Sequence, residues 1–255
     1  MVGARIERVE LRRPDLRTPF PRRFAQRVAG ATTRAVTRRA KYLLAELSSG
    51  ESLLVHLGMS GSFRVVNADA DEDAGAHDHV VFHLASGVDV VFNDPRRFGF
   101  MDLVSTSRLD THPSLRGLSP EPLSGTFDGA MLARACAGKR ASIKAALLDQ
   151  RVVAGLGNIY VVEALHIAGI SPLRPASTLA TPSGAPRDAA GRLVAAIKQV
   201  LAEAIDRQTS TRYRTERFRV YDREREHCRR PRCPGVIRRR VQAGRSTFYC
   251  PVCQR

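Results

Sequence analysis

Four cysteines near the C-terminus have the spacing of a metal site. Cys228 and Cys233 form one pair, Cys250 and Cys253 form a second pair, and residues 236–250 between them have the composition of a β-hairpin. Close thiolate pairs brought together by a hairpin are typical of a tetrahedral four-cysteine zinc site. Because four protein ligands leave no open coordination position, we expect a structural zinc ion rather than a catalytic one.

Other interpretations of these cysteines stay open from the sequence. The pairs could form two disulfides or be unrelated thiols, and His227 could replace one cysteine as a ligand. The fifth cysteine, Cys136, lies in a helical stretch and is interpreted as a buried residue without a chemical role. An odd number of cysteines and zinc-type spacing together indicate a reducing cytosol.

Two short motifs place basic and apolar side chains where predicted strands turn. Residues 56–61 read His-Leu-Gly-Met-Ser-Gly, and residues 94–99 read Asp-Pro-Arg-Arg-Phe-Gly. The second motif puts two guanidinium groups beside an aromatic ring on a tight turn. A phosphate clamp combined with a wedge that fills a gap in a base stack needs this combination. The alternative is a surface turn with a core phenylalanine.

A third motif, Gly-Leu-Gly-Asn at residues 155–158, precedes a predicted helix. Asn158 is expected to be the N-cap of that helix, and the glycines let the backbone turn tightly and expose its amides. A helix N-terminus with free N–H groups binds anions, in the simplest case a DNA phosphate. An ordinary capped helix without a ligand is the alternative.

The charge of the chain indicates a polyanionic partner. The formal net charge is +16, and residues 212–255 contain fourteen arginines against four acidic residues. Such a concentration of positive charge in one part of the chain is typical of proteins that bind nucleic acids. No apolar run approaches the ~18 residues of a membrane-spanning helix, and the first residues lack the apolar region of a signal peptide. We therefore expect no membrane partner.

Lysine is rare in this arginine-rich chain. Only Lys41, Lys139, Lys144 and Lys198 occur among 41 basic residues. A desolvated lysine can lose its proton, whereas arginine effectively cannot, so each lysine is a candidate for chemistry or close phosphate contact. Lys198 lies in an amphipathic helix, and its retention is assigned to chance.

Periodicity predicts the elements that position these residues. Residues 5–104 are read mainly as short strands between turns, which favours a β-sandwich. The expected strands are residues 5–11, 42–47 and 52–57, and a hairpin formed by 79–84 and 88–93. The expected helices are residues 128–148, 159–168 and 188–205. The predicted fold class is α+β, with an N-terminal β-sandwich and a C-terminal helical domain that carries the zinc hairpin.

Taken together and in this order, the motifs resemble those of the Fpg/Nei family of DNA glycosylases and AP lyases. The resemblance rests on residues 56–61, 94–99, 155–160 and 244–253, and it extends from about residue 2 to 255. It implies an enzyme that excises oxidised bases from double-stranded DNA and nicks the abasic site by β,δ-elimination. The implied domains are a β-sandwich (1–106), a linker (107–122), a helix-two-turn-helix domain (123–212) and a zinc finger (213–255).

The resemblance also implies roles for individual residues. Met59, Arg96 and Phe98 would occupy the space left by a flipped nucleotide, with Arg96 facing the orphaned base. Lys41 would lie beside the lesion and assist elimination, and Arg245 would hold the phosphate of the damaged nucleotide and assist the second elimination. The remaining phosphate contacts would come from His77, Lys139 or Arg140, Lys144 and Asn158.

Two departures from the family pattern matter. The family's nucleophile is an N-terminal proline followed by glutamate, and this sequence begins Met-Val-Gly, which aligns after that opening and after the N-terminal helix that follows it in the family. Either the start lies too far downstream, which we favour because Lys41, Arg96 and Arg245 are present, or the chain is a paralogue that binds damaged or abasic DNA without cleaving it. The short stretch 207–218 replaces a longer loop, so the preference between oxidised purines and pyrimidines stays open.

The resemblance also implies that the protein is a cytoplasmic, nucleoid-associated monomer.

Overall fold

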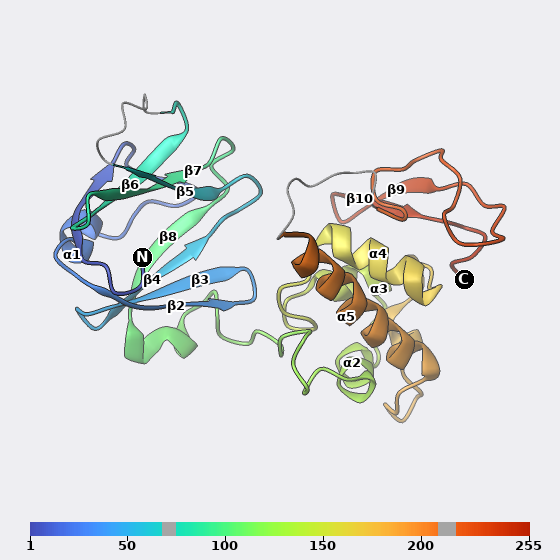
Figure 1. The fold of residues 1–255 in the computed structure, drawn as a ribbon. Coiled ribbons are helices and arrows are strands. Elements are labelled where there is room, and N and C mark those ends of the chain that lie inside the picture. Colours follow the sequence, from blue (N-terminus) through green and yellow to red (C-terminus); the bar gives the residue numbers. More distant parts are fainter. Residues whose placement is uncertain (68–74, 209–217) are drawn as a thin grey trace. The chain divides into compact units, whose positions relative to one another are not determined.

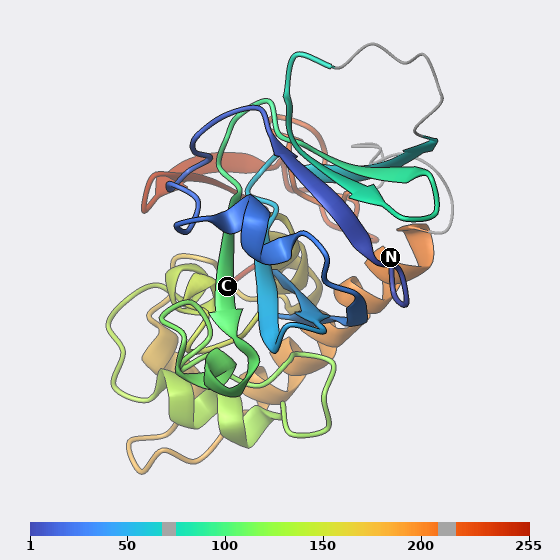
Figure 2. The same ribbon diagram turned by 90° about the vertical axis from the view of Figure 1, so that its left-hand side faces the viewer.

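The computed structural model describes residues 1–67, 75–208 and 218–255 (Figures 1 and 2). The chain divides into two compact units, Met1–Arg116 and Gly117–Arg255. Within the described residues, no helix has both the length and the apolar character needed to cross a membrane.

The first unit is a sandwich of two antiparallel four-stranded sheets, as the strand pattern predicts. One sheet has the order β1-β6-β7-β5 and the other β2-β3-β4-β8, and Figure 1 shows them as separate layers. The strands are β1 (Ile6–Leu11), β2 (Thr33–Arg39), β3 (Tyr42–Leu47), β4 (Glu51–His56), β5 (Ser62–Asn67), β6 (Asp78–Leu84), β7 (Val88–Asn93) and β8 (Phe100–Ser105). A short helix, α1 (Phe24–Val28), and a 3₁₀ helix, η1 (Thr106–Thr111), complete the unit.

Alternation along the strands builds the sandwich core. Leu53 and Val55 of β4, Phe82 of β6 and Phe92 of β7 belong to one buried hydrophobic cluster, whereas the intervening Leu54 and Val81 are buried but do not belong to it. Because successive side chains of a strand point to opposite faces, each sheet presents one apolar face to the other. The turns at the ends of these strands are therefore held on a rigid base.

The second unit is helical and carries a small hairpin. Its elements are α2 (Gly129–Cys136), α3 (Ile143–Leu148), α4 (Asn158–Ala168), η2 (Ala176–Leu179), α5 (Asp188–Gln208), β9 (Arg238–Gln242) and β10 (Arg245–Tyr249). Ala243 and Gly244 join the two strands with positive φ angles of 48° and 71°, the conformation of a two-residue hairpin turn of type I′. The hairpin packs against α4 through Phe248 and Val162, and Figure 1 shows it lying along that helix.

Two sequence predictions in this unit are wrong. The single helix predicted for residues 128–148 is two helices, because Gly138 has a φ angle of 68° and Ser142 caps a new helix by accepting a hydrogen bond from the amide of Ala145. The predicted N-cap, Asn158, is the first residue inside α4, and Gly157 occupies the cap position. The side chain of Asn158 is thereby free to bond elsewhere.

Candidate nucleic-acid interface and metal centre

The four C-terminal cysteines form a group that can hold a metal ion. All four are free thiols, and their sulfur atoms lie within 4.8 Å of one another. The Sγ atoms of Cys228 and Cys253 are 3.7 Å apart, and those of Cys233 and Cys250 are 3.6 Å apart. A tetrahedral site with metal–sulfur bonds of about 2.3 Å has edges of roughly 3.8 Å, whereas a disulfide needs about 2.05 Å. The geometry fits a metal and excludes the disulfide alternative.

Two neighbouring residues, Gly235 and His227, bear on how the cysteine group is formed. A side chain at Gly235 would collide with the Sγ of Cys250, so only glycine allows the chain to pass the sulfur at this point. His227, the alternative ligand, is exposed and does not belong to the group of metal-ligating residues found among the described ranges.

A histidine on α4 contacts the cysteine group directly. The Nε2 of His166 lies 3.2 Å from the Sγ of Cys228, and the side chain is buried. Burial and, to a smaller extent, the nearby charge of Arg230 together lower the pKa of His166 to about 4. The ring is therefore neutral at pH 7 and can donate one N–H to the sulfur. This contact joins the C-terminal end of α4 to the metal centre.

A buried lysine holds the tip of the hairpin. The Nζ of Lys144 on α3 donates to the Thr247 hydroxyl at 2.8 Å and to the carbonyls of Ser246 and Arg245 at 3.2 and 3.3 Å. Asn158 donates from Nδ2 to the same Ser246 carbonyl at 3.1 Å. The structure thus brings Lys144, Asn158 and Arg245 together, with the Arg245 side chain left exposed. Burial and, to a smaller extent, the charge of Arg245 together lower the pKa of Lys144 to about 8.

The other two basic candidates of this unit lie on the connection between α2 and α3. Lys139 and Arg140 are both exposed there, and the Lys139 carbonyl accepts a hydrogen bond from the amide of Ser177. This bond ties the connection to η2. Both side chains are consequently presented at the N-terminal side of α3, the helix that carries Lys144.

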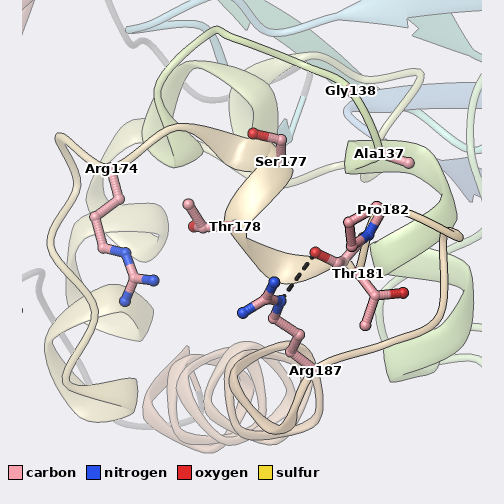
Figure 3. Close-up of a pocket in the computed structure, with 9 residues that line it drawn as sticks. Ala137, Gly138, Arg174, Ser177, Thr178, Thr181, Pro182 and Arg187 are labelled. Atoms are coloured by element: carbon pink, nitrogen blue, oxygen red, sulfur yellow. Dashed lines mark hydrogen bonds between the residues drawn. The ribbon is translucent and has the colours of Figure 1, made fainter.

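A hollow of about 440 Å³ opens beside this connection (Figure 3). Its lining residues are Ala137, Gly138, Arg174, Ser177, Thr178, Ala180, Thr181, Pro182 and Arg187, without a carboxylate among them. Arg187 is held by a hydrogen bond from its Nε to the Ala180 carbonyl at 3.0 Å. The lining of this hollow is therefore positively charged, through Arg174 and Arg187.

In the first unit, two turns that carry the predicted void-filling residues are joined by one buried carboxylate. The Oδ1 of Asp94 accepts a hydrogen bond from the Ser60 hydroxyl at 2.5 Å, and its Oδ2 accepts one from the Gly99 amide at 2.8 Å. Beside these contacts, Met59 is 70% exposed and Phe98 is 42% exposed. Large apolar side chains this exposed on a tight turn are available to a ligand.

The remaining candidates of the first unit lie close to these turns. The guanidinium carbon of Arg96 is 4.9 Å from the centre of the Phe98 ring, a cation–π arrangement. His77 is exposed, and its carbonyl accepts a hydrogen bond from the Asp94 amide at 3.0 Å. Lys41 is exposed in the turn between β2 and β3. The pKa of His56 is lowered mainly by burial and to a smaller extent by the charge of Lys41, which places the two residues near each other.

Sequence reasoning did not single out several residues that organise these groups. Ser60 and Asp94 lie inside the quoted motifs, but serine and aspartate at a turn are expected there for local reasons. Glu163 is buried in α4 and accepts hydrogen bonds from the amides of Arg219, Val220 and Tyr221. The sequence signal that could have identified Glu163 is its position as a charged residue within an otherwise apolar stretch of a predicted helix. The loop prediction for residues 207–218 falls mostly on 209–217, outside the described residues.

Comparison with known families and proteins agrees along the whole chain. Residues 1–101 match the formamidopyrimidine-DNA glycosylase N-terminal domain, and residues 118–215 match the formamidopyrimidine-DNA glycosylase H2TH domain. The formamidopyrimidine-DNA glycosylase of Bradyrhizobium sp. strain BTAi1 is 58% identical over 100% of this chain and 94% of the relative. That of Azorhizobium caulinodans is 57% identical over 99% of this chain and 94% of its own length.

Solved structures give the same result. The Lactococcus lactis Fpg in complex with FAPY-dG-containing DNA has a TM-score of 0.87 at 31% identity, covering 100% of this chain and 94% of that one. A MutM in complex with DNA containing carbocyclic 8-oxo-G has a TM-score of 0.88 at 30% identity, with the same coverage. On the matched domains, the close relatives and the shared fold, the chain belongs to the formamidopyrimidine-DNA glycosylase family of base-excision DNA-repair enzymes.

Proposed function

We propose that this chain excises oxidised bases from double-stranded DNA and cleaves the backbone at the resulting abasic site. The observation that carries the proposal is the pair of joined turns in the first unit. They expose Met59 and Phe98 and place Arg96 over the Phe98 ring. A target nucleotide must leave the stack before its glycosidic bond can be attacked, and the gap it leaves needs apolar and cationic side chains to fill it.

Two further residues take part in the chemistry that we propose. Lys41 lies beside the lesion and assists elimination, and Arg245 holds the phosphate of the damaged nucleotide. Support for Arg245 comes from its position at the hairpin tip, whose backbone carbonyls are bonded to Lys144 and Asn158. The exposed His77, Lys139 and Arg140 supply further phosphate contacts in this proposal.

We assign zinc to the cysteine group. Four thiolates form a soft tetrahedral ligand set that suits zinc, and the sulfur separations of 3.6 and 3.7 Å fit it. When bound, the ion supplies structural cross-linking and no open position for a substrate. The chain's own part is to hold the cysteines in place, through Gly235 and through the contact of His166 with Cys228.

In this family the nucleophile is a proline at the mature N-terminus, followed by glutamate. Its amine nitrogen forms a bond to C1′ of the sugar while the bond from C1′ to the base breaks. The sugar ring then opens by cleavage of the C1′–O4′ bond, with a proton going to O4′, and the resulting Schiff base can be reduced by borohydride. The 255-residue sequence does not contain these two residues. The test therefore compares the chain as it stands with one extended by the family's opening, Pro-Glu-Leu-Pro-Glu-Val-Glu, and the helix that follows it.

Both proteins are incubated with borohydride and duplexes that contain 8-oxoguanine, an oxidised pyrimidine or an abasic site. We expect a covalent adduct only from the extended chain, and the two damaged bases compared side by side give its lesion preference. If neither protein forms an adduct, the chain is a binder of damaged DNA and the proposed activity is wrong. We further propose that the protein acts as a monomer on the nucleoid in the cytoplasm.

A further inference from the structure

We propose that Asp94 is a positioning residue that fixes the void-filling side chains Met59, Arg96 and Phe98 as one rigid group, with Ser60 as its partner. The inference rests on the proposed function, because it assigns a cause to the geometry of those three side chains. It concerns only the first unit, where every contact that supports it is found.

The carboxylate of Asp94 is the link between two loops. It is fully buried, and its two oxygens bond to different turns: Oδ1 to the Ser60 hydroxyl at 2.5 Å and Oδ2 to the Gly99 amide at 2.8 Å. Ser60 follows Met59 directly, and Gly99 follows Phe98 directly. The Ser60 oxygen also accepts a hydrogen bond from the Arg96 amide at 3.2 Å. Met59 is therefore the neighbour of Ser60 in the chain, Phe98 is the neighbour of the Gly99 amide that Asp94 binds, and Arg96 is hydrogen-bonded to Ser60 through its own amide.

Close backbone packing supports the same rigid group. A Cβ at Gly58 would lie 2.5 Å from the backbone of Phe98 and Gly99, so only glycine lets these turns approach so closely. A Cβ at Gly99 would lie 2.9 Å from the His56 carbonyl and 3.0 Å from an Asp94 oxygen. The glycines permit the contact, and the carboxylate fixes it.

The backbone of Asp94 extends the group to β6. Its amide donates to the His77 carbonyl at 3.0 Å, and its carbonyl lies 2.9 Å from the Nε2 of the buried His79. Asp94 therefore bonds through four of its atoms to residues from three segments. Side chains held in advance need less ordering when DNA binds, and this lowers the free-energy cost of occupying the gap.

The test uses DNA affinity of the 255-residue chain, so it does not depend on catalysis. Ser60→Ala, Ser60→Thr and Asp94→Asn are compared with Ser86→Ala, an exposed serine in the hairpin turn between β6 and β7. Affinities are measured for an intact duplex and for a matched duplex with an abasic site. A 2-aminopurine opposite the abasic site reports whether the orphaned base is contacted.

We expect Ser60→Ala to lose roughly tenfold in affinity for the abasic duplex, with little change for the intact one, because the charge-assisted hydrogen bond to Asp94 and the bond from the Arg96 amide are both removed. Ser60→Thr restores the hydroxyl and should recover most of the loss, and Ser86→Ala should behave as the unchanged protein. The affinity of Asp94→Asn for the abasic duplex should lie between those of Ser60→Ala and the unchanged protein. The amide of the new side chain can donate to Ser60, but the side chain cannot accept both hydrogen bonds that Asp94 accepts.

Phe98→Ala separates this inference from the function on which it rests. If Phe98→Ala keeps the preference for the abasic duplex, the proposed void-filling role is wrong. If Phe98→Ala loses that preference and both Ser60→Ala and Asp94→Asn retain it, only the positioning role is overturned. Equal losses for intact and abasic duplexes, or a failure of Ser60→Thr to recover affinity, would also overturn it, because they indicate general destabilisation.

Discussion

The Nζ of Lys144 lies 2.8 Å from the Oγ1 of Thr247, which joins α3 to β10 across 103 residues of sequence. The same hydroxyl donates to the Oε1 of Gln242 at 2.9 Å, on the opposite strand of the hairpin. A single buried ammonium group therefore fixes the conformation of the hairpin tip. The exposed side chain of Arg245 depends on this tip for its direction.

Lys144→Met should weaken both the hairpin and DNA binding. The substitution keeps an apolar stem but removes all three hydrogen bonds of Lys144, and only the Ser246 carbonyl keeps another donor, Asn158. We therefore expect about 1–3 kcal/mol less stability in urea unfolding. Affinity for abasic DNA should fall at least tenfold as the tip loosens. Lys198→Met is the matched control, because Lys198 is only partly buried and donates to the Ser124 carbonyl. Equal effects of the two substitutions would contradict the assignment.

The pKa of Lys144 can be measured directly. Burial lowers it to about 8 from the ordinary 10.5, so the unfolded chain binds more protons than the folded one between these values. The Lys144 contribution to the free energy of unfolding therefore becomes more favourable as the pH rises from about 8 to 10.5. An NMR titration of the Lys144 Cε signal should give a midpoint near 8, and a bound DNA phosphate should move it upward. A midpoint above 10 would show that the ammonium group is not desolvated.

His166→Phe should speed the loss of metal from the cysteine group. Phenylalanine fills a similar volume but removes the N–H that faces the Cys228 sulfur at 3.2 Å. Contacts to ligands from outside the coordination sphere typically contribute 10- to 100-fold to metal affinity, so we expect about tenfold faster transfer of zinc to a chromogenic chelator. An unchanged transfer rate would show that the contact does not stabilise the site.

Chelation should divide the five cysteines into two classes. In the zinc-loaded protein we expect no rapid reaction with a thiol reagent, and after chelation we expect Cys228, Cys233, Cys250 and Cys253 to react. Cys136 should react only on unfolding, because it is fully buried and burial raises its pKa to about 11. Fast modification of a fifth thiol in the folded protein would contradict this assignment.

Glu163→Gln should destabilise residues 219–221, which lead into the cysteine group. The Glu163 carboxylate accepts hydrogen bonds from three consecutive amides, those of Arg219, Val220 and Tyr221, at 2.8 to 2.9 Å. The glutamine side chain would turn an NH₂ group toward one or more of these donors, so we expect about 1–3 kcal/mol less stability. Faster hydrogen exchange at Val220 and Tyr221 should accompany it. Glu203→Gln, at a partly exposed ion pair with Arg219, is the milder comparison.

Several features could be predicted because they depend on neighbours in the sequence. Strands β1, β3, β4, β6 and β7 of the sandwich and the C-terminal hairpin follow from alternation and turn residues. The cysteine group follows from the spacing of Cys228, Cys233, Cys250 and Cys253. The predicted helix over residues 128–148 was wrong because helical periodicity continues across Gly138 and Ser142, where the chain turns. Local patterns locate elements better than they locate their ends.

By itself the sequence determined the family, the sandwich, the hairpin and the cysteines that come together in the cysteine group, since short motifs and periodic patterns specify these locally. Only the tertiary structure decided that Asp94 joins Ser60 to Gly99, that Lys144 holds the hairpin tip and that His166 reaches the Cys228 sulfur. Ser60 and Asp94 are 34 residues apart, and His166 and Cys228 are 62 apart. Such contacts depend on how sheets and helices pack, because a buried polar group takes whichever partner the fold brings within hydrogen-bonding distance.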